Sequence, residues 1–390
     1  MLAFKLALRN LLGAGLRTWL NVIVLSFSFI VIIWTKGLLE GWDRQAKNDM
    51  IKWDIAAGQY WHPSYDPYDP FSLTDSHGPV PQHLTEQAGD TGIAAVLITQ
   101  GTIYPQGRMH SVIIKGIPPE QKVIELPTSE LSAGEGEIPA IIGEAMAAST
   151  GLKQGDNVVL RWRDRNGTFD AAEITITSVF ETTVPTVDVG QVWLPLENLR
   201  EMMLMPGEAT ILITGKDISS SALPGDWVYK SPEDLLADVE MIIKSKSAVG
   251  IIIWGIMLLM AMLAVFDTQV LSIFRRQKEI GTYVALGMTR GQVVGLFTLE
   301  GAMHSVLAAL VGAVYGIPLL MTQSARGVAI PLSSSDFGIS MAERLYPVYS
   351  LGLITGTVLI VFVVTAIVSY WPSRKIARMN PTEALRGRIQ

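Results

Sequence analysis

The sequence has no cysteine among its 390 residues, so disulfides, thiolate metal sites and a cysteine nucleophile are excluded. Charged residues are scarce at 17%, against about 25% in an average soluble protein. This scarcity excludes a disordered chain and a highly charged nucleic-acid-binding protein. The hydrophobic share of 49% and the positive mean hydropathy instead indicate a membrane protein with a water-soluble part.

The sequence also lacks the short motifs of several enzyme classes. It has no G-x-x-x-x-G-K-[S/T] loop for phosphates, no G-x-S-x-G nucleophile turn and no H-E-x-x-H zinc motif. A metal site built on His62 and His77 is the alternative, but both lie among turn residues, which favours solvated side chains. We therefore predict no catalytic residue, and no metal or cofactor bound by this chain.

Four long apolar stretches stand out, and a helix needs about 20 residues to cross a bilayer. The first, third and fourth stretches have this length, and the second reaches it only when it is extended to Ile273. They predict transmembrane helices at 18–40, 247–273, 292–322 and 348–371. The first stretch is too long for the apolar region of a signal peptide, and no small-x-small cleavage site follows it. We therefore interpret it as an uncleaved membrane anchor.

Lysine and arginine gather in three segments that four spans place on one side of a membrane, namely 1–17, 274–291 and 372–390. By the positive-inside rule this side is the cytoplasm, and the segments 41–246 and 323–347 lie outside. Residues 41–246 carry 29 acidic and 15 basic side chains, a net charge of −14, whereas the rest of the chain has a net charge of +8. This asymmetry supports the same orientation.

Residues 41–246 are too numerous for a loop and predict a folded domain with its own core. The stretch IPAIIGEAMAASTGL has the pattern of a strand followed by a helix, and a helix at 232–246 can continue into the second span. The expected fold is an α-helical membrane protein with four transmembrane helices plus a large α+β extracytoplasmic domain between the first two. The expected strands are IAAVLITQGTIY, MHSVIIKGI, NVVLRWRD, AAEITITSVFET, GQVWLPL and ATILITG.

The segment between the second and third spans is the most informative part of the chain. A basic start is followed by EIGTYVALG, which is compatible with a short helix, and then by a turn at Met288–Arg290. A short amphipathic helix between two spans either lies in the membrane interface or docks in a groove of a partner protein. The residues alone leave both interpretations open.

This segment, RRQKEIGTYVALGMTRGQVVGLFTLEG, resembles the hallmark of the FtsX/MacB/Lol permease family of ABC transporters. The tail YWPSRKIARMNPTEALRGR resembles the terminal motif of that family, and LALRNLLGAGLRTWLNVIVLSF resembles its leader before the first span. In the large domain, IPAIIGEAMAASTGLKQGDNVVL is similar to a family segment. The matches reach from one end of the chain to the other.

The resemblance implies a multi-pass protein of the bacterial inner membrane, with both termini cytoplasmic and the large domain periplasmic. It implies a dimer with a second permease copy or paralogue among membrane lipids, resting on a cytoplasmic ABC ATPase that supplies ATP and Mg. Nucleic acid is not an expected partner. Among the branches of the family, we favour the lipoprotein-releasing (LolC/LolE-type) permeases. In these, ATP-driven motion of the outer domain, called mechanotransmission, would release a lipoprotein or hydrophobic substrate. The alternatives are a MacB-like efflux permease with a periplasmic adaptor and an FtsX-like regulator of a cell-wall hydrolase.

The family's helix between spans two and three is the coupling helix that contacts the ATPase. The resemblance implies the same role for a short stretch of the predicted cytoplasmic segment of this chain. The implied coupling residues are Arg275, Arg276, Lys278, Glu279, Ile280, Gly281, Ala285, Leu286 and Gly287.

Two further groups of residues stand out within the predicted spans. Glu300 and His304 lie four apart on one helix face, and intramembrane ionisable groups suggest a function such as a proton relay. A structural role is the alternative, and the family's Glu at this position favours it. Small residues four apart allow close approach of helices, and they occur as Gly312 with Gly316 and as Gly352 with Gly356.

Overall fold

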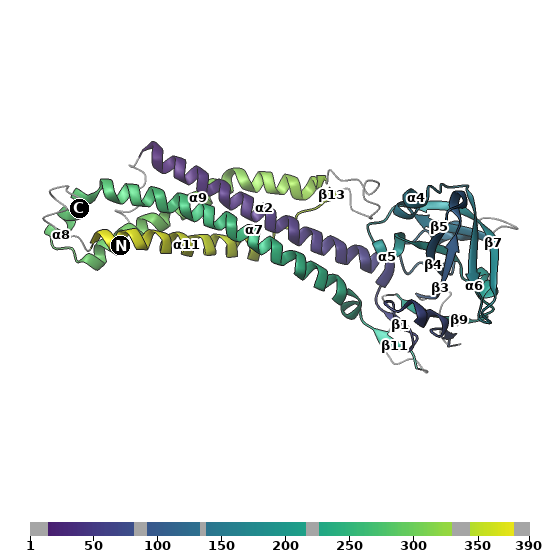
Figure 1. Ribbon diagram of the computed structural model, residues 1–390. Coiled ribbons are helices and arrows are strands. Elements are labelled where there is room, and N and C mark those ends of the chain that lie inside the picture. Colours follow the sequence, from purple (N-terminus) through teal and green to yellow (C-terminus); the bar gives the residue numbers. More distant parts are fainter. Residues whose placement is uncertain (1–14, 82–91, 133–137, 216–225, 330–343, 378–390) are drawn as a thin grey trace. The chain divides into compact units, whose positions relative to one another are not determined.

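The computed structural model describes residues 15–81, 92–132, 138–215, 226–329 and 344–377 (Figure 1). Most of the predicted cytoplasmic leader and tail therefore lies outside the described residues. So does much of the two terminal motifs. Much of the predicted short outer loop does so too.

The chain forms two compact units. The helical unit contains Met1–Asp43, Ile243–Val328 and Leu345–Gln390, and the sheet unit contains Arg44–Ile242 and Ala329–Arg344. The main segment of the sheet unit, Arg44–Ile242, overlaps the large domain predicted at 41–246, and the unit also includes Ala329–Arg344, which the sequence pattern places in the short outer loop.

Long helices build the helical unit, because apolar runs of this length cannot be buried in a small water-soluble core. Two helices, α2 and α7, contribute residues to both units. The long helices are α2 (Leu16–Met50), α7 (Pro232–Arg275), α9 (Arg290–Arg326) and α11 (Leu351–Ala377), and the short α8 (Gln277–Ala285) lies between α7 and α9.

Within the described residues, three helices are long and apolar enough to cross a membrane: Val22–Ile55, Arg290–Arg326 and Leu351–Arg374. They correspond to the first, third and fourth predicted spans. The second predicted span lies inside α7, whose described apolar stretch, Ile251–Met260, is too short to cross a bilayer by itself. The fourth membrane helix therefore stays a prediction.

Apolar side chains from different helices form the core of the helical unit. Residues of α2, α9 and α11 are buried together, and Leu258 and Met262 of α7 pack against them. The buried members of this cluster are Val22, Leu25, Phe29, Ala308, Val361 and Val368.

Two of the predicted packing glycines lie where α9 approaches α2. A Cβ atom added at Gly312 would lie 3.4 Å from Cβ of Ser26, and one added at Gly316 would lie 2.8 Å from Cδ1 of Ile30. The second distance is too short for carbon atoms, so a larger residue at Gly316 requires the Ile30 side chain of α2 to shift. The absence of side chains here permits the close approach.

The other predicted pair, Gly352 and Gly356, behaves differently. A Cβ atom added at either position meets no described atom within 4 Å. Within the described chain, these two glycines therefore form no close helix contact, and their packing role stays a prediction.

This difference predicts the effect of two matched substitutions. We expect Gly316→Leu to lower the thermal unfolding temperature of the detergent-solubilised chain, because the new side chain collides with Ile30. Gly356→Leu is the control, since it adds the same atoms in open space and removes a helix-weakening glycine worth roughly 0.5–1 kcal/mol. Equal unfolding temperatures for the two variants would contradict the close contact between α2 and α9.

The sheet unit is built on a nine-stranded sheet in the order β11-β1-β10-β3-β4-β8-β5-β7-β6. Its strands are β1 (Gln59–Trp61), β3 (Ile93–Ile103), β4 (His110–Ile117), β5 (Ile138–Gly143), β6 (Asn157–Arg163), β7 (Phe169–Phe180), β8 (Gln191–Pro195), β10 (Ile211–Thr214) and β11 (Val228–Lys230). Two short ladders pair β2 (Gly78–Pro79) with β9 (Glu208–Ala209) and β12 (Val328–Ala329) with β13 (Arg344–Leu345).

Part of this sheet closes on itself. The later half of β3 pairs with β6 as well as with β4, so the run from β3 through β4, β8, β5 and β7 to β6 returns to its start. Closure hides the strand edges that an open sheet would expose. β4 pairs with β8 and β5 with β7 in parallel, while β3–β4 and β6–β7 are antiparallel.

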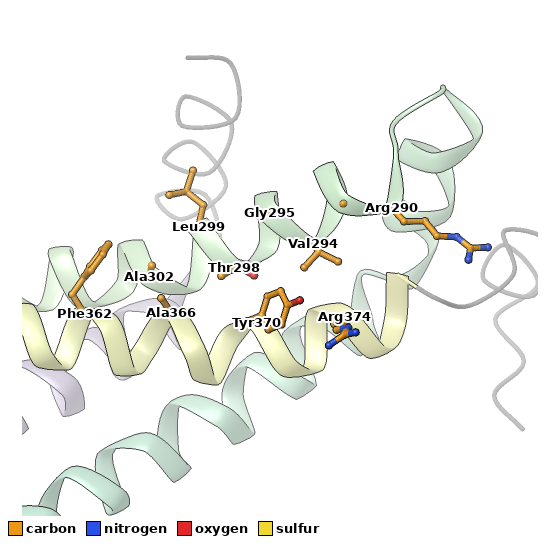
Figure 2. A pocket seen from close by; sticks show the side chains of 11 residues that line it. Arg290, Val294, Gly295, Thr298, Leu299, Ala302, Phe362, Ala366, Tyr370 and Arg374 are labelled. Atoms are coloured by element: carbon orange, nitrogen blue, oxygen red, sulfur yellow. The ribbon is translucent and has the colours of Figure 1, made fainter.

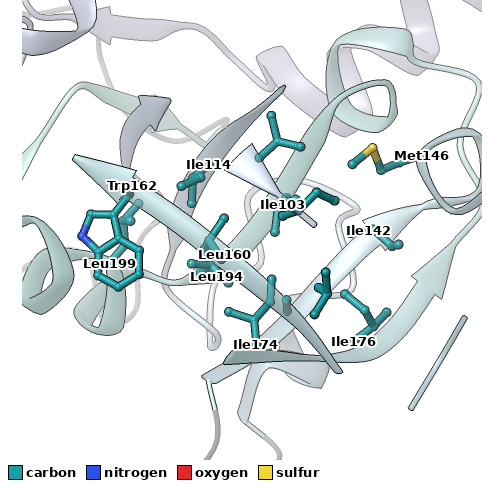
Figure 3. Close-up of a cluster of buried hydrophobic side chains, with 14 of the residues drawn as sticks. Ile103, Ile114, Ile142, Met146, Leu160, Trp162, Ile174, Ile176, Leu194 and Leu199 are labelled. Carbon is teal, nitrogen blue, oxygen red and sulfur yellow. The ribbon is translucent and has the colours of Figure 1, made fainter. Parts of the chain in front are cut away.

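Buried side chains from these strands form the largest core of the unit (Figure 3). The alternation of buried and exposed residues along β6 shows that one face of that strand points inward. Trp162 donates its indole N–H to the Met202 carbonyl at 2.8 Å, which satisfies the polar atom of a buried ring. The labelled core residues include Ile103, Ile114, Ile142, Leu160, Ile174, Ile176 and Leu194.

Short helical segments complete the unit. They are η1 (Ile51–Ile55), η2 (Pro70–Thr74), η3 (Pro105–Gly107), η4 (Thr128–Ser132), α4 (Glu144–Thr150), α5 (Pro185–Asp188) and α6 (Leu196–Met203). The α+β composition agrees with the sequence pattern, and the six expected strands are present as β3, β4, β6, β7, β8 and β10. The strand-then-helix pattern is β5 followed by α4, and the helix expected at 232–246 is the first part of α7.

Candidate functional site

The predicted coupling residues lie on and around α8 in the helical unit. α7 ends at Arg275, and Arg276 is the N-cap residue of α8. At the other end, Leu286 donates its backbone N–H to the Thr282 carbonyl at 2.9 Å. Gly287 follows with a φ of +98°, a conformation that glycine adopts without steric cost. α8 is thus a short helix with a sharp exit.

A capping box starts α9 immediately after this exit. The Thr289 hydroxyl accepts a hydrogen bond from the backbone N–H of Gln292 at 3.3 Å, and the Gln292 side chain accepts one from the Thr289 N–H at 2.9 Å. These reciprocal bonds satisfy donors that a helix start leaves free. The turn between α8 and α9 is therefore fixed by local bonds.

An apolar cluster attaches α8 to α9. Ile280 of α8 is buried against Val293 and Phe297 of α9. Partly buried side chains surround these three, namely Tyr283, Val284 and Met288. The apolar face of the amphipathic helix is therefore covered by the chain itself.

A buried ion pair adds a second attachment. Arg276 donates from Nη1 to both carboxylate oxygens of Glu300, at 2.7 and 2.8 Å, and from Nε to Oε2 of Glu279 at 2.6 Å. The Glu300 side chain is only 8% exposed, and that of Arg276 is 18% exposed. Bonds between ionised groups at such distances are among the stronger hydrogen bonds in proteins. The start of α8 is thereby tied to the interior of α9.

The surroundings of Arg276 keep its charge in place. Burial lowers the pKa of the guanidinium, but the Glu300 carboxylate and the bonds to Glu279 and Glu300 outweigh it, so the pKa lies above its ordinary value. The guanidinium also lies 4.9 Å from the ring centre of Phe297, a cation–π distance. Arg276 is therefore cationic at any physiological pH, as its role opposite Glu300 requires.

The opposite face of α8 is open. Leu286, the C-cap residue of α8, is 78% exposed. Lys278, Thr282 and Ala285 are exposed as well. An apolar side chain at the tip of a rigidly held helix suits insertion into a groove of another protein.

The structure separates the nine implied coupling residues into two groups. Ile280 and Gly281 are buried, and Arg276 is partly buried and bonded to Glu300. The other six are exposed, and they are Arg275, Lys278, Glu279, Ala285, Leu286 and Gly287. Contact of all nine residues with an ATPase stays a prediction.

The intramembrane residues Glu300 and His304 do not pair through their side chains. The Glu300 carboxylate binds Arg276, and His304 Nδ1 bonds to the backbone carbonyl of Glu300 at 2.9 Å. This arrangement lacks the side-chain contact that a proton relay between the two requires, and it supports the structural role. The sequence marks Arg276 and Glu300 separately, but their separation of 24 residues gives no local signal of the ion pair.

The two histidines considered for a metal site, His62 and His77, likewise have ordinary partners. His77 Nδ1 bonds to the Glu208 carboxylate, and the His62 ring lies edge-on to Trp227 with 6.0 Å between ring centres. Burial lowers the pKa of His62, and the charge of His77 lowers it further. Among the described residues, no group of three or more His, Asp or Glu side chains is arranged to hold a metal ion.

Comparison with known proteins identifies a permease domain in part of the helical unit. Residues 251–381 match the FtsX-like permease C-terminal family. The lipoprotein-releasing system transmembrane protein LolC of Xylella fastidiosa is 23% identical over 317 residues, which covers 72% of this chain and 74% of LolC. The macrolide export ATP-binding/permease protein MacB of Sodalis glossinidius is 30% identical over 131 residues, 33% of this chain and 18% of MacB.

Two further comparisons concern YknZ. The uncharacterized ABC transporter permease YknZ of Bacillus subtilis is 24% identical over 219 residues, 56% of this chain and 50% of YknZ. The crystal structure of the extracellular domain of a noncanonic ABC-type transporter YknZ from Gram-positive bacteria gives a TM-score of 0.26 at 11% identity. That match covers 41% of this chain and 83% of the domain, and its score is too low to establish a shared fold.

The apolar helices, the large folded unit and the family match together define a membrane permease. The chain is an ABC transporter permease of the FtsX, MacB and LolC type, with an FtsX-like permease domain at 251–381. Its homologues are permeases of transport systems, and one of them, MacB, is named as both ATP-binding protein and permease.

The ion pair predicts that Glu300→Gln lowers the stability of the helical unit much more than Glu279→Gln does. We expect Glu300→Gln to destabilise the helical unit by about 3–5 kcal/mol, because it leaves the Arg276 charge buried without its main partner. Glu279→Gln makes the same chemical change on a side chain that is 53% exposed, so its expected cost is about 0–1 kcal/mol. Thermal unfolding of the full chain in detergent measures both.

A double variant tests whether the loss arises from the unpaired charge. Arg276→Met with Glu300→Met removes both charges and keeps side-chain volume, so it should recover much of the stability that Glu300→Gln loses. A Glu300→Gln protein that unfolds no earlier than the Glu279→Gln protein would show that the pair does not hold α8.

Proposed function

We propose that this chain is the membrane subunit of an ABC transporter and converts ATP hydrolysis by a separate ATPase into motion of its sheet unit. The observation that carries the proposal is the exposed Leu286 at the tip of α8, beside a core and an ion pair that fix that helix on α9. A rigidly held helix transmits displacement, whereas a loosely attached one would absorb it.

α7 supplies a path for that motion. It is one helix from Pro232 to Arg275, it contributes residues to both units, and it ends next to the N-cap of α8. At 1.5 Å per residue, its 44 residues extend over roughly 66 Å. A displacement at α8 therefore has a continuous covalent and hydrogen-bonded connection to the sheet unit.

The complete assembly is part of the same proposal. The permease is a multi-pass protein of the bacterial inner membrane, with both termini cytoplasmic and the sheet unit periplasmic. It forms a dimer with a second permease copy or a paralogue, and it uses ATP and Mg only through the ATPase. The distribution of lysine and arginine in the sequence supports the orientation.

For the substrate, we favour lipoprotein or hydrophobic substrate release from the inner membrane. Support comes from LolC, whose match covers 72% of this chain and reaches beyond the permease domain. The match to MacB, at 30% identity over 131 residues, supports the alternative of an efflux permease working with a periplasmic adaptor. Regulation of a cell-wall hydrolase, in the manner of FtsX, is the third candidate.

Docking through α8 is tested by changing its exposed tip. We expect Leu286→Glu to abolish co-purification of the ATPase and to lower its stimulation at least roughly tenfold, because a charge enters an apolar groove without a partner. Leu286→Met is the matched control, since it keeps an apolar side chain of similar volume. Membrane insertion and thermal unfolding should be unchanged in both, because the side chain is 78% exposed.

If Leu286→Glu retains full stimulation of the ATPase, α8 is not the docking helix. The same tagged preparation, extracted from native membranes in mild detergent, separates the functional candidates by mass spectrometry. Lipoproteins or a paralogous permease would support release, an adaptor would support efflux, and a hydrolase would support regulation. Absence of any ATPase would contradict the proposal itself.

A further inference from the structure

A groove of about 680 Å³ lies between α9 and α11 within the helical unit (Figure 2). Its wall is apolar over most of its length, with Val294 and Leu299 from α9 and Phe362 from α11. Small residues leave the space open, among them Gly295 of α9 and Ala366 of α11. A Cβ atom added at Gly295 would meet nothing within 4 Å, so the groove exists because side chains are missing there.

One end of this groove is basic. Arg290, the first residue of α9, and Arg374, near the end of α11, both line it and are both exposed. Neither guanidinium forms an ion pair with any residue in the described part of the chain. Tyr370 lies between the two helices one turn before Arg374, as Figure 2 shows.

The dimensions of the groove match one leaflet of a membrane. From Arg290 to Ala302 α9 advances twelve residues, roughly 18 Å at 1.5 Å per residue. From Phe362 to Arg374 the antiparallel α11 covers the same twelve-residue length. Half of a bilayer's hydrocarbon core is roughly 15 Å thick. The groove thus has a basic end at one membrane surface and an apolar body reaching toward the bilayer centre.

We propose that this groove binds one anionic phospholipid, with its phosphate between Arg290 and Arg374 and its acyl chains along the apolar wall. The proposal rests only on the membrane-spanning character of α9 and α11, not on docking of an ATPase at α8. By the distribution of lysine and arginine, the basic end lies at the cytoplasmic surface, so the lipid belongs to that leaflet.

Charge complementarity selects this occupant over others. A basic pocket between transmembrane helices suits an anionic headgroup, and arginine holds phosphate oxygens in bidentate geometry. A helix of a second copy covering the groove would bury two arginines without a counter-charge from the described residues, which is costly. A phospholipid supplies the negative charge and the apolar chains in one molecule.

The test uses the full chain, purified in detergent and studied by native mass spectrometry with added lipid. We expect phosphatidylglycerol to be retained at least roughly tenfold more tightly than phosphatidylcholine, because each arginine near an anionic headgroup contributes about a factor of five. The variant Arg290→Gln with Arg374→Gln should lose this preference. Arg326→Gln, which removes a charge at the opposite end of α9, is the control and should retain it.

A second variant tests the apolar body without touching the charges. Gly295→Leu with Ala366→Leu fills the groove, so we expect it to reduce retention of both lipids while thermal unfolding is unchanged. Equal retention of the two lipids by the unaltered chain, or retention unaffected by either variant, would overturn the proposal. Displacement of phosphatidylglycerol by inorganic phosphate alone would also overturn it, because it would show a free-anion site.

The absence of cysteine allows a direct check for a second copy in the groove. Gly295→Cys introduces a single thiol, and oxidation joins two chains only where two such thiols meet. High-yield cross-linking between copies would show that the groove is a chain–chain interface and would overturn the lipid assignment. No cross-linking, together with the selective retention of phosphatidylglycerol, is the expected result.

Discussion

The arrangement of the candidate site depends on the ion pair between Arg276 and Glu300. A carboxylate within an apolar helix is expensive unless a counter-charge reaches it, and Glu300 is only 6% exposed. Arg276 provides that charge from the N-cap of α8, with two short bonds to the same carboxylate. The requirement to neutralise Glu300 thus fixes where α8 begins relative to α9.

This constraint also decides which surface α8 offers. With Arg276 directed at Glu300 and Ile280 buried against Val293 and Phe297, the apolar face of the helix is used internally. Leu286 is left exposed at the far end. Arg276 of the ion pair lies where α7 ends and α8 begins. The bonds that orient the exposed face of α8 therefore lie next to the end of α7, which contributes residues to the sheet unit. Docking and transmission share one attachment point.

The sequence predicts the parts of this protein that are encoded locally. Long apolar runs predict the helices, and short runs of β-type residues predict six strands, because each run reflects the burial of one element. The three-residue strands β1 and β11 were missed, since β1 lies in a segment rich in proline and aromatics that also suits turns. Closure by β3 and β6 joins Gly101 to Trp162, far apart in sequence, and no local pattern records it. The partner of Glu300 was missed for the same reason.

The arginines of the helical unit show how burial determines the role of one residue type. Arg276 has its counter-charge within the chain, where partial burial reduces screening by water, and it therefore serves as a structural attachment. Arg290 and Arg374 are exposed at the end of an apolar groove and have no carboxylate among the described residues. Two unpaired charges beside an apolar wall attract a molecule that is itself anionic at one end and apolar at the other. In a membrane an anionic phospholipid fits this description, because its headgroup carries the negative charge and its acyl chains are apolar.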